Sequence, residues 1–407
     1  MKSVKLASIL FYLNSVFVVF CFVSCGSSPT EASSLLTADI RGGMDKPGLL
    51  GLGDEIKGVT FVPLEVTTDD ASLIDGVYDY AVTDRYIYVL PVKEPRIVLF
   101  DRQGRFIRTL VKEGQGPGEF RGILPCIQVD ERNDRLFLFS NNRVWEYTLE
   151  GEFIGQSTHE YSVIYMRHIG KDRFAAISFP FQPFNGGGFG LGLFSRKGDT
   201  IAIKNDFYSF LLPHEKSGFT TSIAPAYSDA QNSVLFKTGS NDTVFCISAD
   251  RISAACVLDL KNSDAEVIRS LDVTDMSNLR IEKKDPKDIF VQDMIEFPGH
   301  YYFRILYNQG YYIASVDKKT GKTLVEKCVM PGSIYELADA NLQHGMQGTR
   351  SYRNFPVWGR VIKDELVQVV TPYELNLYKS LRSITIPQEL DLKGEEGNPV
   401  FVFYSLI

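Results

Sequence analysis

The eight residues Phe100-Asp101-Arg102-Gln103-Gly104-Arg105-Phe106-Ile107 place a polar turn between two short apolar runs. The same pattern returns at residues 147–154 and at residues 194–201, where its glycine is Gly151 and Gly198. Successive glycines are 47 residues apart in both cases. A period in the forties with several strands per unit is typical of the blades of a β-propeller.

Short runs of β-branched and aromatic residues surround these turns. Residues 86–90, 96–100 and 106–110 are such runs, and turn-forming residues separate them. Runs of this kind predict strands joined as hairpins, and no amphipathic helix interrupts this part of the chain. Residues 316–324 are a later copy of the repeated turn. The pattern therefore predicts an all-β fold.

The composition is that of a folded protein. Of the 407 residues, 44% are hydrophobic and 12% aromatic, which excludes disordered and fibrous classes. The formal charge of −7 and the isoelectric point near 5.4 argue against a nucleic-acid partner, for which a basic surface is expected. At this period the length allows seven or eight blades.

The second half of the chain is less regular. Residues 259–293 contain a charged stretch that indicates an insertion. Residues 335–347 and 374–383 have helix-like patterns and are expected to be small helical excursions on the blades.

The N-terminus has the layout of an export signal. Lys2 and Lys5 precede the uncharged run 6–23, which is followed by Ser24-Cys25-Gly26. Because the run is long, a retained membrane anchor is the alternative. Phe22-Val23-Ser24-Cys25 resembles a bacterial lipobox, with Phe in place of the usual Leu. The resemblance implies a signal peptide over residues 1–24 and acylation of Cys25, whose several acyl chains anchor the protein to the lipid bilayer.

The expected organisation has three parts. The signal peptide, residues 1–24, is followed by a lipid-anchored polar tether, residues 25–58, and then by the propeller, residues 59–407. We expect the protein in the bacterial cell envelope, at the outer membrane. Residues 26–34 contain only one acidic residue, Glu31, which favours the periplasmic side over the cell surface.

Three motifs suggest a family. Gly114-Gln115-Gly116-Pro117-Gly118-Glu119-Phe120, Asn241-Asp242-Thr243-Val244-Phe245 and Asn398-Pro399-Val400 follow one another in this order. They resemble motifs of the six-bladed β-propeller lipoproteins of Bacteroidales, which are relatives of the NHL-repeat type. The resemblance covers residues 59–407 and implies six blades, without an assigned chemistry.

No pattern of catalytic or metal-binding residues is visible in the sequence. Residues 114–120 do not have the Lys and Ser/Thr of a phosphate loop and predict a turn between blades. The five His are scattered, and residues 130–134 do not have the ligand pattern of a calcium loop. There is no G-x-S-x-G motif. We therefore expect no metal, no cofactor and no catalytic residue.

The remaining cysteines are too sparse for a disulfide framework. They are Cys126, Cys246, Cys256 and Cys328. Each lies in an apolar context, so we expect small buried side chains, with one disulfide as the alternative.

Four residues are candidates for a ligand-binding face. Arg304 is a charge within the apolar run 301–306, and strand alternation can aim it at the channel, where it would bind an anionic group. Phe181, Phe184 and Phe189 surround a glycine-rich run and would stack on a sugar ring or a partner. The alternatives are a surface arginine and ordinary packing of the aromatic rings.

Two threonines lie in a three-residue pattern. Asp199-Thr200-Ile201 and Asp242-Thr243-Val244 resemble the acceptor sequence for O-glycosylation on exported proteins of this bacterial group. Thr200 and Thr243 are therefore candidate glycosylation sites, although both patterns also fit ordinary turns.

The favoured function is a binding or scaffold module for a glycan, peptide or protein partner, because rigid propellers present loops for recognition. A monomer is expected. The alternative is a hydrolase or lyase of the NHL or gluconolactonase-like type, with its site in the channel.

The chain ends predict how the ring closes. Residues 59–66 alternate as a strand, but Pro63 cannot donate a ladder bond and therefore restricts it to an edge. Residues 400–404 are apolar on both faces, as expected of a more central strand. We predict that the N-terminal strand is the outer strand of the last blade, beside the C-terminal one.

Overall fold

The computed structural model describes most of the propeller. The described residues are 35–48, 50, 55–121, 126–140, 142–159, 163–178, 181–182, 191–204, 210–211, 226–230, 232–237, 242–260, 272–273, 281–282, 289–307, 310–328, 360–380 and 397–407. Almost all of them belong to one compact unit, Leu36–Ile407.

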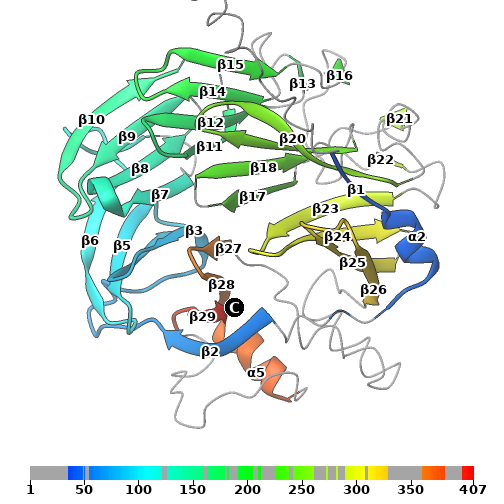
Figure 1. Cartoon of the computed structure of the whole chain (residues 1–407). Helices are drawn as coiled ribbons and strands as arrows, with labels where there is room; N and C mark the ends of the chain where they lie inside the picture. Colours follow the sequence, from blue (N-terminus) through cyan, green and yellow to red (C-terminus); the bar gives the residue numbers. More distant parts are fainter. Residues whose placement is uncertain are drawn as a thin grey trace, which may run out of the picture. The chain divides into compact units, whose positions relative to one another are not determined.

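Six antiparallel sheets form a six-bladed propeller (Figure 1), which confirms the predicted fold class and blade number. Blade 1 contains β3 (Val77–Val82), β4 (Tyr86–Pro91), β5 (Arg96–Asp101) and β6 (Phe106–Lys112). Blade 2 contains β7 (Cys126–Asp130), the short 3-10 helix η2 (Glu131–Asn133), β8 (Arg135–Ser140), β9 (Arg143–Tyr147) and β10 (Phe153–Thr158). Blade 3 contains β11 (Val163–His168), β12 (Arg173–Ser178), β14 (Leu191–Ser195) and β15 (Thr200–Lys204).

The other three blades complete the ring. Blade 4 contains β17 (Ala226–Ala230), β18 (Ser233–Lys237), β19 (Thr243–Ser248) and β20 (Ile252–Leu258), and blade 5 contains β23 (Ile289–Glu296), β24 (His300–Tyr307), β25 (Gly310–Asp317) and β26 (Thr323–Cys328). Blade 6 contains β27 (Arg360–Ile362), β28 (Glu365–Val370), β29 (Val400–Leu406) and β2 (Ile56–Pro63). Two small sheets pair β13 (Phe181–Gln182) with β16 (Phe210–Leu211) and β21 (Asp272–Val273) with β22 (Ile281–Glu282). The first strand of each blade lies toward the centre of the ring (Figure 1).

The hydrophobic core is divided among the seams between blades. Each of the six seams holds its own cluster of buried apolar side chains, contributed by both neighbouring sheets. Strands buried on both faces explain the apolar runs such as residues 96–100 in the sequence. The propeller is therefore stabilised by contacts between successive blades.

The repeated glycine is a seam contact. Gly104, Gly151, Gly198 and Gly321 all have positive φ, between +74° and +96°, in the turn between the third and fourth strands. A Cβ on Gly151 would lie 3.2 Å from Cβ of Leu110, on the outer strand of the preceding blade. The position thus needs glycine for its backbone conformation and for the close approach of the next blade.

The loop at residues 114–120 is a turn between blades 1 and 2, as predicted. The Glu119 carboxylate accepts a hydrogen bond from the backbone N–H of Gly116 at 2.7 Å. Phe120 is fully buried, and its ring lies edge-on to Trp145 with the centroids 6.4 Å apart. The motif therefore forms a tight turn, and Phe120 packs in the hydrophobic cluster between blades 1 and 2.

The ring closes as predicted. Strand β2 is the outer strand of blade 6 and pairs antiparallel with β29, with Pro63 opposite Val400. Strand β29 lies between β2 and β28, and its residues Val400, Phe401 and Val402 are at most 1% exposed. Strand β2, which precedes blade 1 in the sequence, and the C-terminal strand β29 thus belong to one sheet (Figure 1).

The side chain of Asn398 stabilises this closure by hydrogen bonds. Its side-chain amide donates to the carbonyls of Glu65 and Ser72 at 2.7 and 2.8 Å and accepts from the N–H of Ile74 at 2.8 Å. The side chain is 3% exposed. Asn398 therefore connects the loop that follows β2 to the start of β29.

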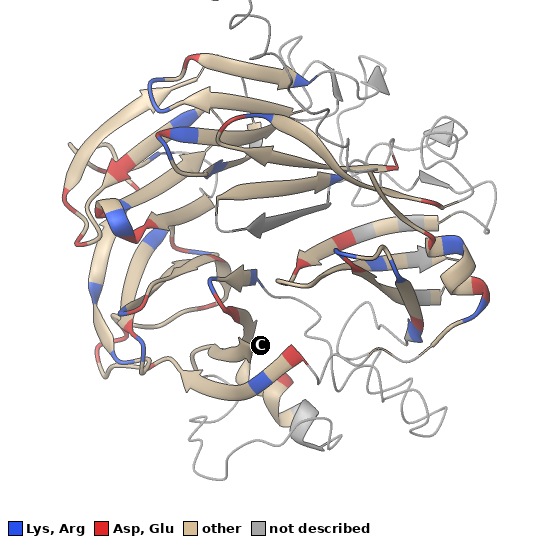
Figure 2. Cartoon of the chain, in the orientation of Figure 1, with Lys and Arg blue, Asp and Glu red and all other residues tan. Residues whose placement is uncertain are grey.

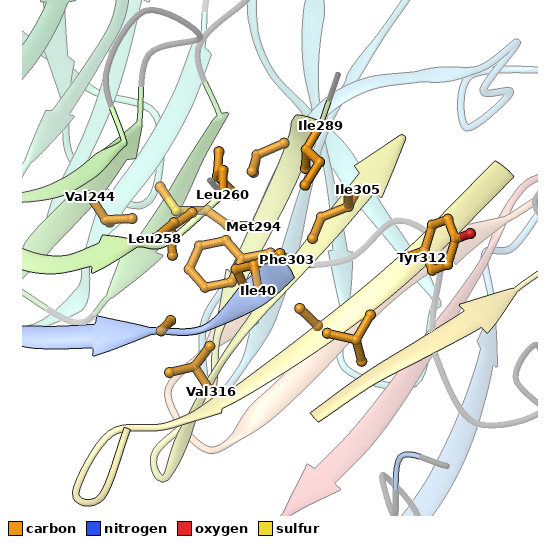
Figure 3. Packing of buried hydrophobic residues seen from close by; sticks show 14 of the residues in the cluster. Ile40, Val244, Leu258, Leu260, Ile289, Met294, Phe303, Ile305, Tyr312 and Val316 are labelled. Carbon is orange, nitrogen blue, oxygen red and sulfur yellow. The ribbon is translucent and has the colours of Figure 1, made fainter. Parts of the chain in front are cut away.

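Part of the expected tether is structured and packs on the propeller. Strand β1 (Leu36–Ala38) adds to β20 as a parallel fifth strand, and helix α2 (Ile40–Asp45) contacts β26. Ile40 is fully buried beside Leu258, Met294 and Phe303 (Figure 3). This segment resembles a tether in the sequence because its few apolar residues are scattered among glycines and charged residues, without the periodicity of a helix or a strand.

The helix α5 (Pro372–Ser380) overlaps the helix-like pattern found at residues 374–383. The similar pattern at residues 335–347 lies outside the described residues. The described helices include none long and apolar enough to cross a membrane. Among the described cysteines, Cys246 and Cys256 are free thiols.

Candidate functional site at the propeller axis

A cavity of about 770 Å³ opens where the inner strands end. Its wall comes from all six blades: the ends of β3, β7, β11, β23 and β27, together with Asn232 after β17. Ile127, Val361 and Phe297 give it apolar surface, and charged side chains from several blades give it polar surface. A cavity of this size, partly apolar and partly polar, is typical of a site for a small ligand.

Side chains join the inner strands of blades 6, 1, 2 and 3. Arg360 Nη1 lies 2.5 Å from Asp79 Oδ1 and donates to the carbonyl of Tyr80 at 3.0 Å. Asp79 Oδ2 accepts from the N–H of Ile127 at 2.7 Å, and Arg167 Nη1 donates to the carbonyl of Ile127 at 2.5 Å. Inner strands of neighbouring blades share no backbone ladder, so these charged side chains hold them in register.

Tyr80 of blade 1 contacts blade 6 through its hydroxyl and through its ring. Its hydroxyl donates to the carbonyl of Val367 at 2.8 Å, and the Arg360 guanidinium lies over its ring at 4.9 Å from the centroid. Burial raises the pKa of Tyr80 to about 12, while the charges of Arg360 and Arg167 oppose this rise. Tyr80 is therefore a neutral donor at neutral pH.

His168 lies at the end of β11 and lines the cavity. The Gln128 amide donates to the His168 carbonyl at 2.7 Å and also accepts from the His168 N–H. Nδ1 of His168 is 3.5 Å from Oδ2 of Asp130. Burial lowers the pKa of His168, although the Asp130 charge acts in the opposite direction. The imidazole is therefore neutral, with Asp130 beside one nitrogen.

Ion pairs between turns form the rim. Lys363 Nζ lies 2.5 Å from Asp84 Oδ1 and 2.8 Å from Glu131 Oε2, so one ammonium joins the turns of blades 6, 1 and 2. Its hydrogen bond and charge hold the pKa of Asp84 below the usual value. On blade 5, Lys318 pairs with Glu296 at 2.5 Å. Acidic and basic residues are interspersed over the described strands and turns (Figure 2).

Of the four predicted ligand residues, only Arg304 has a described side chain, and it lies outside this cavity. Arg304 is on β24, the second strand of blade 5, and pairs with Asp293 at 3.3 Å; it is not among the cavity-lining residues. Burial raises the pKa of Asp293, and the charge of Arg304 opposes this effect. Phe184 and Phe189 lie outside the described residues, and for Phe181 only the backbone, in β13, is described.

Each of the two candidate glycosylation threonines is the first residue of a strand. Thr200 is exposed at the start of β15, and Thr243 is half-buried at the start of β19. Cys25 lies outside the described residues.

The sequence contained a signal for one of the arginines that line the cavity, Arg167. Arg167 follows the apolar residues Val163 to Met166, which is the same pattern that drew attention to Arg304. What the pattern does not give is whether the strand is the first or the second of its blade. Arg360 begins a strand of only three residues and has no such signal.

The described part of the chain contains no group of three or more His, Cys, Asp or Glu side chains arranged to hold a metal ion.

The chain belongs to the family described as "Domain of unknown function (DUF4934)", whose model matches residues 35–405. None of the curated proteins matches it. The structure of a candidate exported protein from Bacteroides fragilis is similar with a TM-score of 0.65 at 14% identity, over 91% of this chain and 99% of that one. A protein of unknown function from Bacteroides caccae matches with a TM-score of 0.32 at 12% identity, over 66% of this chain and 84% of that one. The first likeness shows the shared fold.

Proposed function

We propose that this DUF4934 protein is an extracytoplasmic, lipid-anchored binding module whose ligand occupies the axial cavity. The observation that carries the proposal is the cavity itself, which residues of all six blades line at the ends of their inner strands. A glycan or a peptide fits the combination of apolar wall and paired charges better than a purely apolar molecule.

The roles of the charged side chains favour binding over catalysis. Asp79, Arg167 and Arg360 bond backbone groups of neighbouring blades, and Lys363 joins three turns. Groups engaged in this way keep a rigid wall, which reduces the entropic cost of binding a ligand.

A cavity-filling variant tests the proposal. Asn232→Trp places a large ring at an exposed wall position, and Gln103→Trp is the matched control on an exposed turn away from the cavity. The probes are a panel of neutral and acidic monosaccharides, disaccharides and dipeptides, and the readout is the melting temperature. We expect at least one probe to raise it in the parent and in Gln103→Trp, but not in Asn232→Trp. Equal shifts in both variants, or no shift with any probe, would contradict cavity binding.

One observation favours a second function. His168 is a neutral imidazole beside Asp130 at the cavity wall, the arrangement needed for a general base. A hydrolase or lyase would therefore depend on His168. Release of nitrophenol from nitrophenyl glycosides, abolished in His168→Gln at unchanged melting temperature, would support this function and oppose a pure binding module.

The anchoring part of the proposal rests on the N-terminal sequence. Ser24-Cys25-Gly26 follows the apolar run, and the description of the similar Bacteroides fragilis protein as a candidate exported protein is in keeping with export. Cys25→Ala is expected to abolish labelling with radioactive palmitate and recovery in the membrane fraction. Persistent labelling of this variant would show that another residue is acylated.

A further inference from the structure

The charged residues of the axial cavity form two groups, one in the turns and one on the inner strands. Its rim consists of turn residues such as Asp84, Glu131 and Lys363. Its floor, which we define as Tyr80, Ile127, Arg167 and Arg360, is joined by the hydrogen bonds described above. Arg360 begins β27, and Lys363 lies in the turn that follows this strand.

The floor is cationic. It contains two guanidinium groups, and the carboxylate of Asp79 offsets one of these charges by pairing with Arg360, which leaves a net positive charge. Asp79, which pairs with Arg360, is 3% exposed and does not belong to the described cavity wall. A positive group held in a partly enclosed site attracts an anion more strongly than the same group in water.

Arg360 is held in place and still accessible. Asp79, the Tyr80 carbonyl and the Tyr80 ring fix its guanidinium, while 26% of its side chain is exposed. A guanidinium has five N–H donors in a plane that matches the geometry of an oxyanion. Because its orientation is already fixed, binding an anion costs little side-chain entropy.

The rim does not oppose the entry of an anion as strongly as its acidic residues suggest. The cavity wall holds five acidic and five basic residues, and three of the acidic ones are paired: Asp84 and Glu131 with Lys363, and Glu296 with Lys318. These lysines reduce the negative potential that a ligand meets before it reaches the floor.

We propose that the ligand of the axial cavity carries an oxyanion, such as a carboxylate, sulfate or phosphate group, and that Arg360 binds this group. The remainder of the ligand packs on the apolar wall formed by Ile127, Val361 and Phe297. This inference rests on the proposed function of the cavity as a binding site.

The test compares charged and neutral probes at matched ionic strength. D-glucuronate, glucose 6-phosphate and glucose 6-sulfate are titrated beside glucose, with sodium chloride added to equalise the salt, and saturation is followed by calorimetry. We expect at least one charged sugar to bind saturably and glucose to bind far more weakly. The three anions distinguish carboxylate, phosphate and sulfate as the preferred group.

Arg360→Lys keeps the positive charge beside Asp79 but loses the planar donor pair, so affinity for the charged sugar should fall about tenfold or more. Arg96→Lys is the matched control: Arg96, like Arg360, donates to backbone carbonyls, here those of Ala71 and Leu73, but it lies outside the described cavity wall. If Arg360→Lys fails to fold, Asp79→Asn combined with Arg360→Gln removes both charges and should also lose binding.

The outcomes separate this inference from the proposed function. Equal affinity for glucose and the charged sugars, lost in Asn232→Trp but not in Arg360→Lys, would overturn the role of the anion and leave cavity binding intact. Loss of affinity in Arg96→Lys equal to that in Arg360→Lys would also overturn it. Absence of binding by every probe would overturn both proposals.

Discussion

Blades 1 to 3 and blades 4 to 6 are held together in different ways. Blades 1 to 3 come from the continuous stretch 77–204, and a turn glycine of each blade contacts the outer strand of the preceding sheet. In the other half, the segment 36–63 contributes β1 to blade 4, covers blade 5 with α2 and provides the outer strand of blade 6. The first half therefore relies on contacts close in sequence, and the second depends on a remote segment.

This difference predicts the largest effect at the closure. Deleting residues 399–407 removes β29, whose Val400, Phe401, Val402, Phe403 and Leu406 are all at most 4% exposed. At about 1.5–3 kcal/mol for each buried side chain, the loss is about 10 kcal/mol, within the range of 5–15 kcal/mol that is typical of a whole domain's stability. The truncated protein should be insoluble or unfolded by circular dichroism. Soluble protein that melts within a few degrees of the parent would show that blade 6 is dispensable.

The closure can also be weakened at one residue. Asn398→Ala removes three buried hydrogen bonds and leaves their backbone partners unsatisfied, which should cost about 3 kcal/mol in the free energy of unfolding. The control is Asn133→Ala, an exposed turn residue whose amide donates to Asp130. Urea denaturation should give a large fall in midpoint only for Asn398→Ala. Similar midpoints for both variants would mean that the amide of Asn398 does not hold the closure.

The regular half was readable from the sequence because its turns recur at a fixed spacing. Gly104, Gly151 and Gly198 have the same backbone conformation and the same seam position, so one physical requirement repeats along the chain. Pro63 and the doubly apolar run at residues 400–404 indicated the closure for a similar reason, because each restricts a strand to an edge or to the interior. The packing of residues 36–45 was not readable, because Ile40 and Met44 find their partners more than 200 residues away.

The site was harder to predict than the fold. Arg304 and Arg167 both lie in apolar strands, but only Arg167 lines the axial cavity, because strand order within a blade decides which residue reaches the axis. The Asp79 and Arg360 pair joins the first blade to the last across 281 positions. Only the closure of the ring brings these two residues together, so neither local periodicity nor a short motif marks them.

The turn glycines test whether β1 replaces an outer strand in the irregular half. A Cβ on Gly321 would lie 3.2 Å from Leu36 Cδ1 and from the Thr37 carbonyl oxygen, as a Cβ on Gly151 would lie beside Leu110. Gly151→Ala and Gly321→Ala should each cost about 1–2 kcal/mol, because alanine is strained at positive φ. Gly155→Ala is the control, since nothing lies within 4 Å of its added Cβ. Because positive φ strains both positions alike, a cost for Gly321→Ala well below that for Gly151→Ala would show that β1 packs on its turn less tightly than β6 does.

The smallest expected effect is a pH dependence in the seam between blades 2 and 3. His159 is 3% exposed and packs edge-on against Phe174 and Phe194, with ring centroids 6.2 and 5.7 Å apart. In the described structure neither of its ring nitrogens has a hydrogen-bond partner, and burial lowers its pKa below 6.5. His159 is therefore neutral in the folded protein, and protonation requires the seam to loosen.

Acid should therefore weaken this seam. Below pH 6.5 the unfolded chain binds a proton at His159 that the folded protein does not, so stability falls as the pH decreases from 7 until the folded pKa is reached. For one such group the loss is at most about 1.4 kcal/mol at pH 5.5. His159→Phe fits the aromatic surroundings and should reduce the slope of the unfolding free energy against pH by one proton. His168, whose pKa burial also lowers, still contributes to this slope in both proteins. Urea denaturation of the parent and the variant at pH 7.5, 6.5 and 5.5 measures the difference, and parallel curves would show that His159 is protonated in the folded state or is solvated in the seam.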